Sequence, residues 1–467
     1  MMSDSRIPRL HGNTYTDNVE GGYMLVYNPL SEKGVAVLNK EAAFLFQQID
    51  QKKTLHDIFL QAQGLDRNVD FHDVASVFEN FFSSEIIYFD TPRVKNKFFR
   101  GKPKHLGVWL HITNQCNLRC TYCYVWKTHE KMSDATARKA IVTIVRDAVR
   151  HGFEKIIFKF AGGECLLAFP LILDLVREGR RLAGNVVAID FVVLTNGVLI
   201  TEDVARKLKE ERIKAAVSLD GLGEYNDAQR IFPSGLGSFQ YVERGIQSLQ
   251  HERVPFNVSV TITARNVENV PQLTHYLLER SIPFAFNFYR ENPYVKEAMR
   301  SDEETLIACL KKAYGLISQC PPRHSVMNGL LDRVVFTRPH VYTCGMGNSY
   351  LVVRHDGKIA PCPVALDEVS GSIDDEDVID TMQRSQFAKR RNVPIERRTS
   401  CMDCQWKYIC CGGCPLLNFE PKTGANARSP YCAVYKALIP EVLKVEAKRL
   451  LAYGTREAQE LPGSLAS

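Results

Sequence analysis

The chain of 467 residues is about three times as long as a typical domain, so it has enough residues for more than one hydrophobic core. Apolar residues make up 45% and charged residues 24%, which are the proportions of a globular protein and exclude long disorder. A net charge of +6 is too small for this length to indicate nucleic-acid binding, and the absence of a signal-peptide pattern or a run of about 18 apolar residues predicts a cytoplasmic protein with no membrane span.

The N-terminal 92 residues are predicted to form a small α+β unit. Residues 22–38 read as two short strands around a turn that contains Asn28, Pro29 and Gly34. Thr54 is the expected N-cap of the second of three helices. These helices are predicted at residues 40–49, 55–63 and 71–82. The basic segment 93–105, which contains Pro103, is typical of an exposed linker.

An alternation of strands and helices follows the linker, and it predicts a parallel sheet in an α/β region. A doubly wound sheet and a partial or complete barrel both fit this pattern. Strands are predicted at residues 106–112, 155–160, 187–194, 213–219, 256–262 and 284–289. Helices are predicted at residues 134–151, 171–183, 202–211, 238–252 and 269–280.

Four polar segments come directly after, or end, successive predicted strands. They are TNQCNLRCTYC after the first strand, AGGE after the second, TNG after the third and SLDG at the fourth. Because active sites of parallel α/β proteins collect at the carboxyl ends of the strands, these segments are expected to meet.

Three cysteines of the first segment are candidate ligands of an inorganic group. Cys116, Cys120 and Cys123 lie on one short loop, and their soft thiolates select zinc, copper(I) or iron–sulfur clusters. Zinc normally takes a fourth ligand, and only His111 and His129 lie nearby in the sequence. A four-iron cluster held by three cysteines would keep one iron open for a substrate. Fourteen cysteines in a reducing compartment are in any case unlike a disulfide framework.

The C-x3-C-x2-C spacing, with Tyr122 before the last cysteine, resembles that of the radical S-adenosylmethionine (radical SAM) superfamily. The resemblance implies that Cys116, Cys120 and Cys123 ligate a 4Fe-4S cluster. Its open iron would bind the amino and carboxylate groups of S-adenosylmethionine, and reductive cleavage would yield a 5'-deoxyadenosyl radical.

The other strand ends are similar to cofactor-binding positions of this superfamily. The resemblance implies that Gly-Gly-Glu approaches the methionine amino group, that later polar residues face ribose and methionine, and that an arginine meets the carboxylate. Cys165 departs from the family, which commonly has proline there. The implied cofactor-binding residues are Tyr122, Gly162, Gly163, Glu164, Asn196, Ser218, Asp220 and Arg230. No catalytic acid or base is nominated.

A second group of cysteines begins at Cys344, with the spacing C-x12-G-x4-C, then C-x2-C-x5-C-x3-C from Cys401, then Cys432. From the residues alone a zinc ribbon is the alternative, because its paired knuckles have related spacing. The whole pattern resembles the SPASM extension of peptide-modifying radical SAM enzymes. That resemblance implies two auxiliary 4Fe-4S clusters and therefore three clusters in all.

The family partition implies one auxiliary cluster on Cys401, Cys404, Cys410 and Cys432, and another on Cys344, Cys362 and Cys414. Residues 345–361 contain no cysteine, so we expect the second of these clusters to keep an open iron, with Cys411 as the alternative fourth ligand. Cys309 and Cys320 lie on an amphipathic helical pattern and are expected in the core.

The N-terminal unit is similar to the PqqD-like element that binds leader peptides of ribosomally made, modified peptides. An exposed edge strand of this unit would accept the leader as an added strand. The implied fold class is α/β, a partial (β/α)6 TIM-type barrel with an N-terminal winged-helix-like α+β domain and a C-terminal SPASM iron–sulfur domain. The expected divisions are 1–92 (PqqD-like), 93–105 (linker), 106–320 (radical SAM barrel), 321–455 (SPASM) and 456–467 (tail).

The resemblance implies an oxidoreductase that installs a carbon–carbon or thioether crosslink in a ribosomal precursor peptide. An electron donor such as a flavodoxin or ferredoxin is implied as well, and neither nucleic acid nor membrane is an expected partner. The alternatives are a sulfatase-type maturase that forms formylglycine, a peptide epimerase, and a zinc-binding adaptor or RNA-binding protein. Iron–sulfur protein is brown and zinc protein is colourless, which separates the last alternative from the rest.

Overall fold

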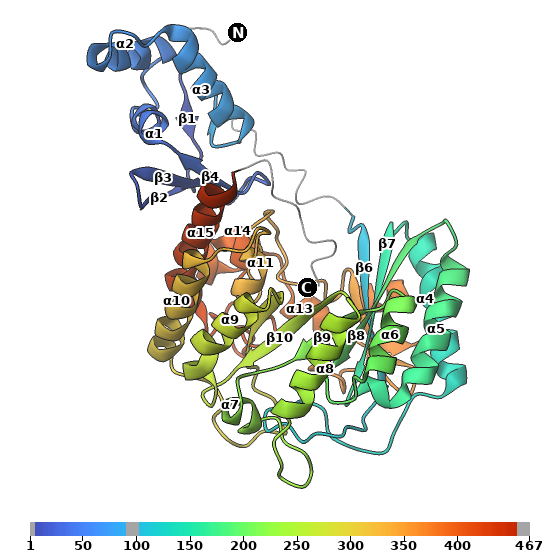
Figure 1. Ribbon diagram of the computed structural model, residues 1–467. Coiled ribbons are helices and arrows are strands. Elements are labelled where there is room, and N and C mark those ends of the chain that lie inside the picture. The colour runs from blue at the N-terminus through green and yellow to red at the C-terminus, as the bar shows by residue number, and fades with distance from the viewer. Residues whose placement is uncertain (1–4, 90–101, 455–467) are drawn as a thin grey trace.

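The computed structural model describes residues 5–89 and 102–454 (Figure 1). Residues 93–101 of the predicted linker and the predicted tail at 456–467 lie outside this part of the chain. At the other end of the predicted linker, the first barrel strand already begins at His105. No helix in the described ranges combines the length and the apolar character that crossing a membrane requires.

The N-terminal unit contains the predicted hairpin and the three predicted helices, together with a third strand in the sheet of the hairpin and a separate two-stranded ladder. The strands are β2 (Tyr15–Val19), β3 (Tyr23–Tyr27) and β4 (Val35–Leu38), and they pair antiparallel in that order. The helices are α1 (Lys40–Gln47), α2 (Leu55–Leu65) and α3 (Phe71–Ser83). Thr54 is the N-cap of α2, as predicted, and it forms a capping box with Asp57. A short ladder joins β1 (Arg9–Leu10) to β5 (Ile87–Tyr88).

Both faces of this three-stranded sheet are covered. Met24, Val26 and Leu38 pack with α1, α2 and α3 in a separate small core. The opposite face, with Leu25 and Tyr27, joins the main core of the protein against α15 (Cys432–Tyr453). Figure 1 shows the unit seated on the end of that helix.

Polar contacts add to this docking. The hydroxyl of Tyr27 donates to the carbonyl of Phe336 at 2.8 Å, and Lys444 on α15 pairs with Asp17 on β2 at 3.0 Å. The ring centroids of Tyr15 and Trp406 lie 5.1 Å apart. The N-terminal unit therefore contacts the SPASM-like region directly.

A mostly parallel sheet forms the centre of the remaining chain. All six predicted strands are present, and five crossover helices follow them in order. The strands are β6 (His105–Thr113), β7 (Lys155–Gly162), β8 (Ala188–Thr195), β9 (Lys214–Ser218), β10 (Phe256–Ile262) and β11 (Phe284–Phe288). The helices are α4 (Asp134–Arg150), α5 (Phe169–Ala183), α6 (Glu202–Glu210), α8 (Phe239–His251) and α9 (Val270–Glu279), with α7 (Glu224–Asp227) inserted before α8.

The order of the strands decides between the two predicted architectures. Each strand from β6 to β11 pairs with its immediate successor, always parallel. A doubly wound sheet reverses direction at a switch point, whereas successive right-handed crossovers without a reversal place the helices on one side and curve the sheet as in a barrel. The arrangement fits a partial barrel.

The sheet continues beyond the six predicted strands. Strand β12 (Tyr350–Val353) pairs parallel with β6, and β13 (Lys358–Ala360) and β14 (Gly371–Ser372) extend the sheet to nine strands. Tyr350 lies opposite Gly107, where a Cβ would come within 2.7 Å of the Tyr350 ring, so the absence of a side chain at Gly107 lets the strands meet. The sheet is therefore shared across the boundary predicted at residue 320.

One long helix and four short ones follow β11 and precede α15. They are α10 (Glu303–Gln319), α11 (Met327–Leu330), α12 (Val378–Arg384), α13 (Gln386–Arg391) and α14 (Lys407–Cys410). Cys309 on α10 is buried, as expected, but the expectation for Cys320 is wrong. Cys320 is exposed, because it is the C-cap residue where the amphipathic pattern ends.

Candidate active site

The cysteine triplet lies on the loop that leaves β6. The register with β7 shifts between His111 and Thr113, so a bulge redirects the chain just before this loop. The backbone N–H of Leu118 donates to Sγ of Cys116 at 3.4 Å, and Lys127 Nζ lies 3.1 Å from Sγ of Cys123. Burial raises the pKa of Cys116, whereas Lys127 and the Leu118 N–H lower it, so these two groups favour the thiolate, which is the form that binds metal.

The glycine pair and Glu164 hold the end of β7 against this loop. The N–H of Gly163 donates to the carbonyl of Thr113 at 2.6 Å, and a Cβ on Gly163 would lie 2.0 Å from the carbonyl oxygen of Gln115. The chain thus needs glycine there for a close backbone approach.

Glu164 is fully buried and joins the second strand end to the third. Its carboxylate accepts hydrogen bonds from Thr195 Oγ1 at 2.8 Å, from the N–H of Asn196 at 2.8 Å and from the N–H of Leu166 at 3.0 Å. Burial raises the pKa of Glu164, and these donors oppose the rise. Oε2 accepts a single one of these bonds, which leaves an acceptor position for a ligand.

The buried residues Asp220 and Arg230 form a hydrogen-bonded group with the half-buried Tyr122. The Tyr122 hydroxyl donates to Asp220 Oδ2 at 2.5 Å, and Arg230 Nη1 lies 2.5 Å from that hydroxyl and 3.3 Å from Asp220 Oδ2. Asp220 Oδ1 accepts from the N–H of Thr261 at 2.8 Å. Both oxygens of Asp220 are therefore occupied by the protein.

Arg230 retains a donor that the described residues do not use. Its Nε is buried and has no hydrogen-bond partner among them. Although burial alone would lower the pKa of Arg230, Cys120, Tyr122 and Asp220 raise it well above its ordinary value. A buried cation with an unpaired N–H next to the cysteine loop fits the carboxylate of a ligand.

Two further predicted cofactor residues lie at the neighbouring strand ends. Asn196 follows β8, and its Nδ2 donates to Asn117 Oδ1 on the cysteine loop at 2.7 Å. Ser218 is the last residue of β9 and is half-buried. The structure therefore brings the polar segments of the first four strands to one edge of the sheet, as the sequence predicts.

The seven cysteines of the second field separate into two groups. Burial, together with the nearby thiols of Cys404, Cys401 and Cys432, raises the pKa of Cys410 to about 12. Burial likewise raises the pKa of Cys362 to about 12, with contributions from Cys414 and Cys344. These neighbours are the same two sets that the family partition implies.

Cys411 stands apart from the set that contains Cys344. Its Sγ donates to the carbonyl of His340 at 3.0 Å, and the residue has left-handed backbone with φ of 47°. Its thiolate neighbours are Cys410 and Cys401. This geometry gives no support to Cys411 as a fourth ligand beside Cys344, Cys362 and Cys414.

None of the described cysteines forms a disulfide. Among the described residues, no three His, Cys, Asp or Glu side chains converge as the ligands of a single metal ion do. Thiolates that share a multi-iron cluster bind different irons and so stand further apart than ligands of a single ion. The three sets of thiols, which are half-buried except for the buried Cys414 and have N–H or cationic groups near several of their sulfurs, fit iron–sulfur clusters on these grounds.

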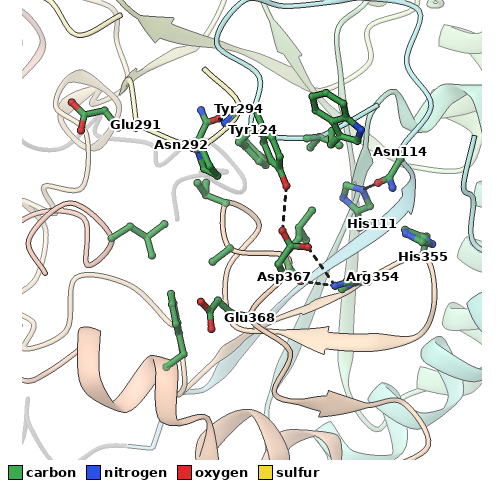
Figure 2. Close-up of a pocket in the computed structure, with 18 of the residues that line it drawn as sticks. His111, Asn114, Tyr124, Glu291, Asn292, Tyr294, Arg354, His355, Asp367 and Glu368 are labelled. Carbon is green, nitrogen blue, oxygen red and sulfur yellow. Dashed lines mark hydrogen bonds and ion pairs between the residues drawn. The ribbon is translucent and has the colours of Figure 1, made fainter. Parts of the chain in front are cut away.

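Figure 2 shows a pocket of about 350 Å³, whose lining includes residues that directly follow the cysteine triplet and residues that follow Cys362. Its walls come from the carboxyl ends of β6, β11 and β12 and from the loop after Cys362. Tyr124 lines it directly after Cys123, and Val364 lines it two residues beyond Cys362. The pocket therefore adjoins both groups of candidate ligands.

Charged and aromatic side chains surround the mouth of this pocket. Figure 2 shows Asp367 between Tyr294, whose hydroxyl donates to it at 3.2 Å, and Arg354, whose Nη1 lies 3.8 Å away. The ring centroids of Trp126 and Tyr294 lie 5.6 Å apart. These pocket residues were not predicted from the sequence. Arg354 and Asp367 follow β12 in the chain, and they become part of the site only because β12 pairs with β6.

His111 lines the same pocket and is held neutral. Burial lowers its pKa to about 4, and its Nε2 lies 2.7 Å from Asn114 Oδ1. We expect stability to fall as the pH drops from 6.5 to 4, because the unfolded chain binds a proton there that the fold does not. The full effect is about 3 kcal/mol. Urea midpoints measured across this range should depend less on pH in His111→Gln, and an unchanged dependence would contradict this assignment.

Comparisons with known proteins agree with this geometry. Residues 110–277 match the radical SAM superfamily, and residues 344–405 match the SPASM iron–sulfur cluster-binding domain. The chain is 26% identical over 352 residues to the cysteine-type anaerobic sulfatase-maturating enzyme of Clostridium perfringens, covering 69% of this chain and 91% of that protein.

Two solved structures share the fold. The first is anSMEcpe with bound AdoMet and Cp18Cys peptide, with a TM-score of 0.62 and 23% identity, covering 73% of this chain and 98% of that one. The second is Streptococcus suis SuiB bound to precursor peptide SuiA, with a TM-score of 0.51 and 16% identity, covering 90% of this chain and 98% of that one. Because the match to SuiB covers 90% of this chain, it must include part of the N-terminal 92 residues. The chain therefore carries a radical SAM domain and, C-terminal to it, a SPASM domain, with S-adenosylmethionine and iron–sulfur clusters as their cofactors.

Proposed function

We propose that this protein is a radical SAM maturase that installs a carbon–carbon or thioether crosslink in a ribosomally made precursor peptide. The observation that carries the proposal is the pocket lined by residues that follow the cysteine triplet and by residues that follow Cys362. A peptide side chain bound there lies beside both groups of candidate cluster ligands. This position suits a reaction in which the peptide loses a hydrogen atom on the side of the cysteine triplet and an electron on the side of the second cysteine field.

The chain's own residues perform the binding part of this reaction. Polar groups at the mouth of the pocket, including Asn292 and Asp367, are placed to bind a peptide backbone, and the rings of Trp126 and Tyr294 are placed to cover it. A peptide bound beneath these exposed rings would displace water, and its reacting carbon would be held in place. When bound, S-adenosylmethionine and the clusters supply the hydrogen-abstracting and electron-accepting chemistry.

The cluster ligands that we propose are those that the sequence implies. Cys116, Cys120 and Cys123 would hold the cluster that binds S-adenosylmethionine. Of the two sets in the second field, the one with Cys344 has three members and would keep an open iron. A flavodoxin or ferredoxin in the reducing cytoplasm is the kind of electron donor that such a protein needs.

The N-terminal unit is proposed to bind the leader of the precursor in the manner of a PqqD-like, winged-helix-like domain. Within the described residues β4 pairs with β3 alone, so its other edge carries backbone groups without a strand partner. An extended leader would pair with that edge. The fold shared with SuiB, which includes part of this unit, supports the proposal.

Proline substitutions on β4 test this docking site. Successive backbone N–H groups of a strand point to opposite edges. Of the variants Ala36→Pro and Val37→Pro, one therefore removes an N–H that points away from β3, and the other removes an N–H that pairs with β3 and so breaks the β3–β4 ladder. The variant that keeps its helical circular dichroism should bind the leader up to about tenfold more weakly, as loss of one hydrogen bond predicts. Fluorescence anisotropy with a labelled leader measures this. Unaltered affinity in the folded variant would exclude β4 as the site.

The crosslinking reaction is tested with the reduced, iron-loaded protein, S-adenosylmethionine and a candidate precursor from the neighbouring reading frame. We expect 5'-deoxyadenosine and a peptide lighter by two hydrogen atoms whose tandem mass spectrum shows a bridged segment. Epimerisation instead leaves the mass unchanged in H₂O and adds deuterium in D₂O.

Maturation of a sulfatase is the second candidate function, favoured by the 26% identity to the Clostridium perfringens enzyme over 352 residues. Its product, formylglycine, carries an aldehyde that a hydrazide reagent captures, whereas a crosslink does not react. A hydrazide-reactive product from a sulfatase peptide, together with no change in any precursor, would replace the crosslinking proposal by this one.

A further inference from the structure

Arg398 is a buried cation that lacks a carboxylate partner. Its side chain is 1% exposed, and its Nη2 donates to the carbonyl of Arg391 at 3.2 Å. Its Nε and Nη1 are buried without a hydrogen-bond partner among the described residues, and no ion pair in that part of the chain includes it. A buried guanidinium in this state is strongly unfavourable unless a negative charge faces it.

The candidate negative charges are thiolates from both cysteine sets of the SPASM region. Nη1 of Arg398 lies 3.0 Å from the position of a Cβ on Gly412, so the guanidinium rests against the loop between Cys410 and Cys414. Burial lowers the pKa of Arg398, and Cys401, Cys411, Cys410 and Cys344 raise it. The cation thus lies within electrostatic reach of Cys401 and Cys410 of one set, of Cys344 of the other, and of Cys411, which belongs to neither.

Another arginine near these cysteines differs in how its charge is balanced. Arg290 Nε lies 3.4 Å from Sγ of Cys414, but its Nη2 pairs with both carboxylate oxygens of Asp332, at 2.8 and 3.0 Å. Its charge is matched within the protein. Arg398 has no such carboxylate, so its position is explained only if the thiolate groups carry negative charge.

We propose that Arg398 is a positioning residue whose charge is the buried counter-ion of the iron–sulfur cluster on Cys401, Cys404, Cys410 and Cys432, and that it raises the reduction potential of this cluster. The inference rests on the cluster assignment of the proposed function. A cluster held by four thiolates is an anion, and one-electron reduction adds a further negative charge. A cation fixed beside it stabilises the reduced form more than the oxidised one, which raises the potential.

The test compares Arg398→Met, Arg398→Lys and Arg397→Met in the full-length protein purified without oxygen. Arg397 is the exposed neighbour and is the matched control. The readouts are iron per chain and the midpoint potentials from redox titration followed by electron paramagnetic resonance. A Cys432→Ala variant identifies the signal of the cluster in question, because that signal is missing from it.

In Arg398→Met we expect either a lower midpoint potential of this signal or loss of about four irons per chain, because the counter-ion is gone. Arg398→Lys keeps the charge and should retain both iron and a potential close to the unmodified value. Arg397→Met should change neither.

Two results would overturn the inference. One is unchanged iron and potential in Arg398→Met. The other is an equal loss in Arg398→Met and Arg398→Lys, which would show that the guanidinium shape and its bond to the Arg391 carbonyl matter rather than charge. Failure of the proposed function is recognised separately: a colourless, zinc-containing protein refutes the clusters themselves, whereas an iron-loaded protein that leaves every peptide unchanged refutes the substrate and not Arg398.

Discussion

Replacing Cys116, Cys120 and Cys123 together by alanine should abolish cleavage of S-adenosylmethionine. The three thiols lie on the loop at the carboxyl end of β6, beside the unpaired Nε of Arg230. Loss of second-shell partners of a metal costs about 10–100-fold in activity, and loss of the ligands themselves should exceed this and reduce cleavage to background. The formation of 5'-deoxyadenosine under reducing conditions measures the effect, and iron analysis should show about four irons fewer per chain.

Cys309→Ala is the matched control for this triple variant. Cys309 is buried, whereas the cysteine triplet is half-buried, and it lies on α10 and belongs to none of the three cysteine sets. The Cys309→Ala variant should retain both its iron and its cleavage of S-adenosylmethionine. If the triple variant still cleaved the cofactor, the first cluster would have to be held elsewhere, and the assignment of the candidate active site would be wrong.

Asp220→Ala should be one of the most destabilising single substitutions in the barrel. The change removes the carboxylate that pairs with the buried Arg230 and accepts from the half-buried Tyr122 and Thr261. Breaking a buried ion pair by removing one partner costs about 3–5 kcal/mol, because the remaining charge is left uncompensated. Thermal and urea unfolding, followed by circular dichroism on protein with intact clusters, measure the loss.

Asp203→Ala provides a surface comparison. Asp203 pairs with Lys207 at 2.6 Å on α6, where both side chains are about half exposed and solvent screens the interaction. This variant should unfold close to the unmodified protein. Equal unfolding midpoints for Asp220→Ala and Asp203→Ala would show that Arg230 finds another partner. The structural role that we assign to Asp220 would then be wrong.

The existence and the order of the barrel strands and helices could be predicted from local sequence patterns. Each barrel strand has apolar side chains facing the helices, and polar residues interrupt the pattern where the strand ends, so strands and crossovers are predicted to within about two residues. The two cysteine sets of the SPASM region were likewise implied by spacing together with a family resemblance.

Pairing between distant segments could not be predicted in the same way. Strand β2 has the sequence YTDNV, in which only Val19 is buried, so it lacks the apolar signal of a strand and gains its place by pairing with β3. Strand β12 is short, and its partner β6 lies more than 200 residues earlier in the chain. Such contacts depend on the assembled sheet.

The sequence alone determined the barrel strands and helices, the positions of the thiols and the polar residues at the strand ends. These features depend on residues that are only a few positions apart in the chain. Only the tertiary structure decided that the sheet continues through β12, that residues after the cysteine triplet and after Cys362 line one pocket, and that Arg398 is buried without a carboxylate. Each of these results from long-range packing, in which the free energy of burial selects among partners that local sequence cannot distinguish.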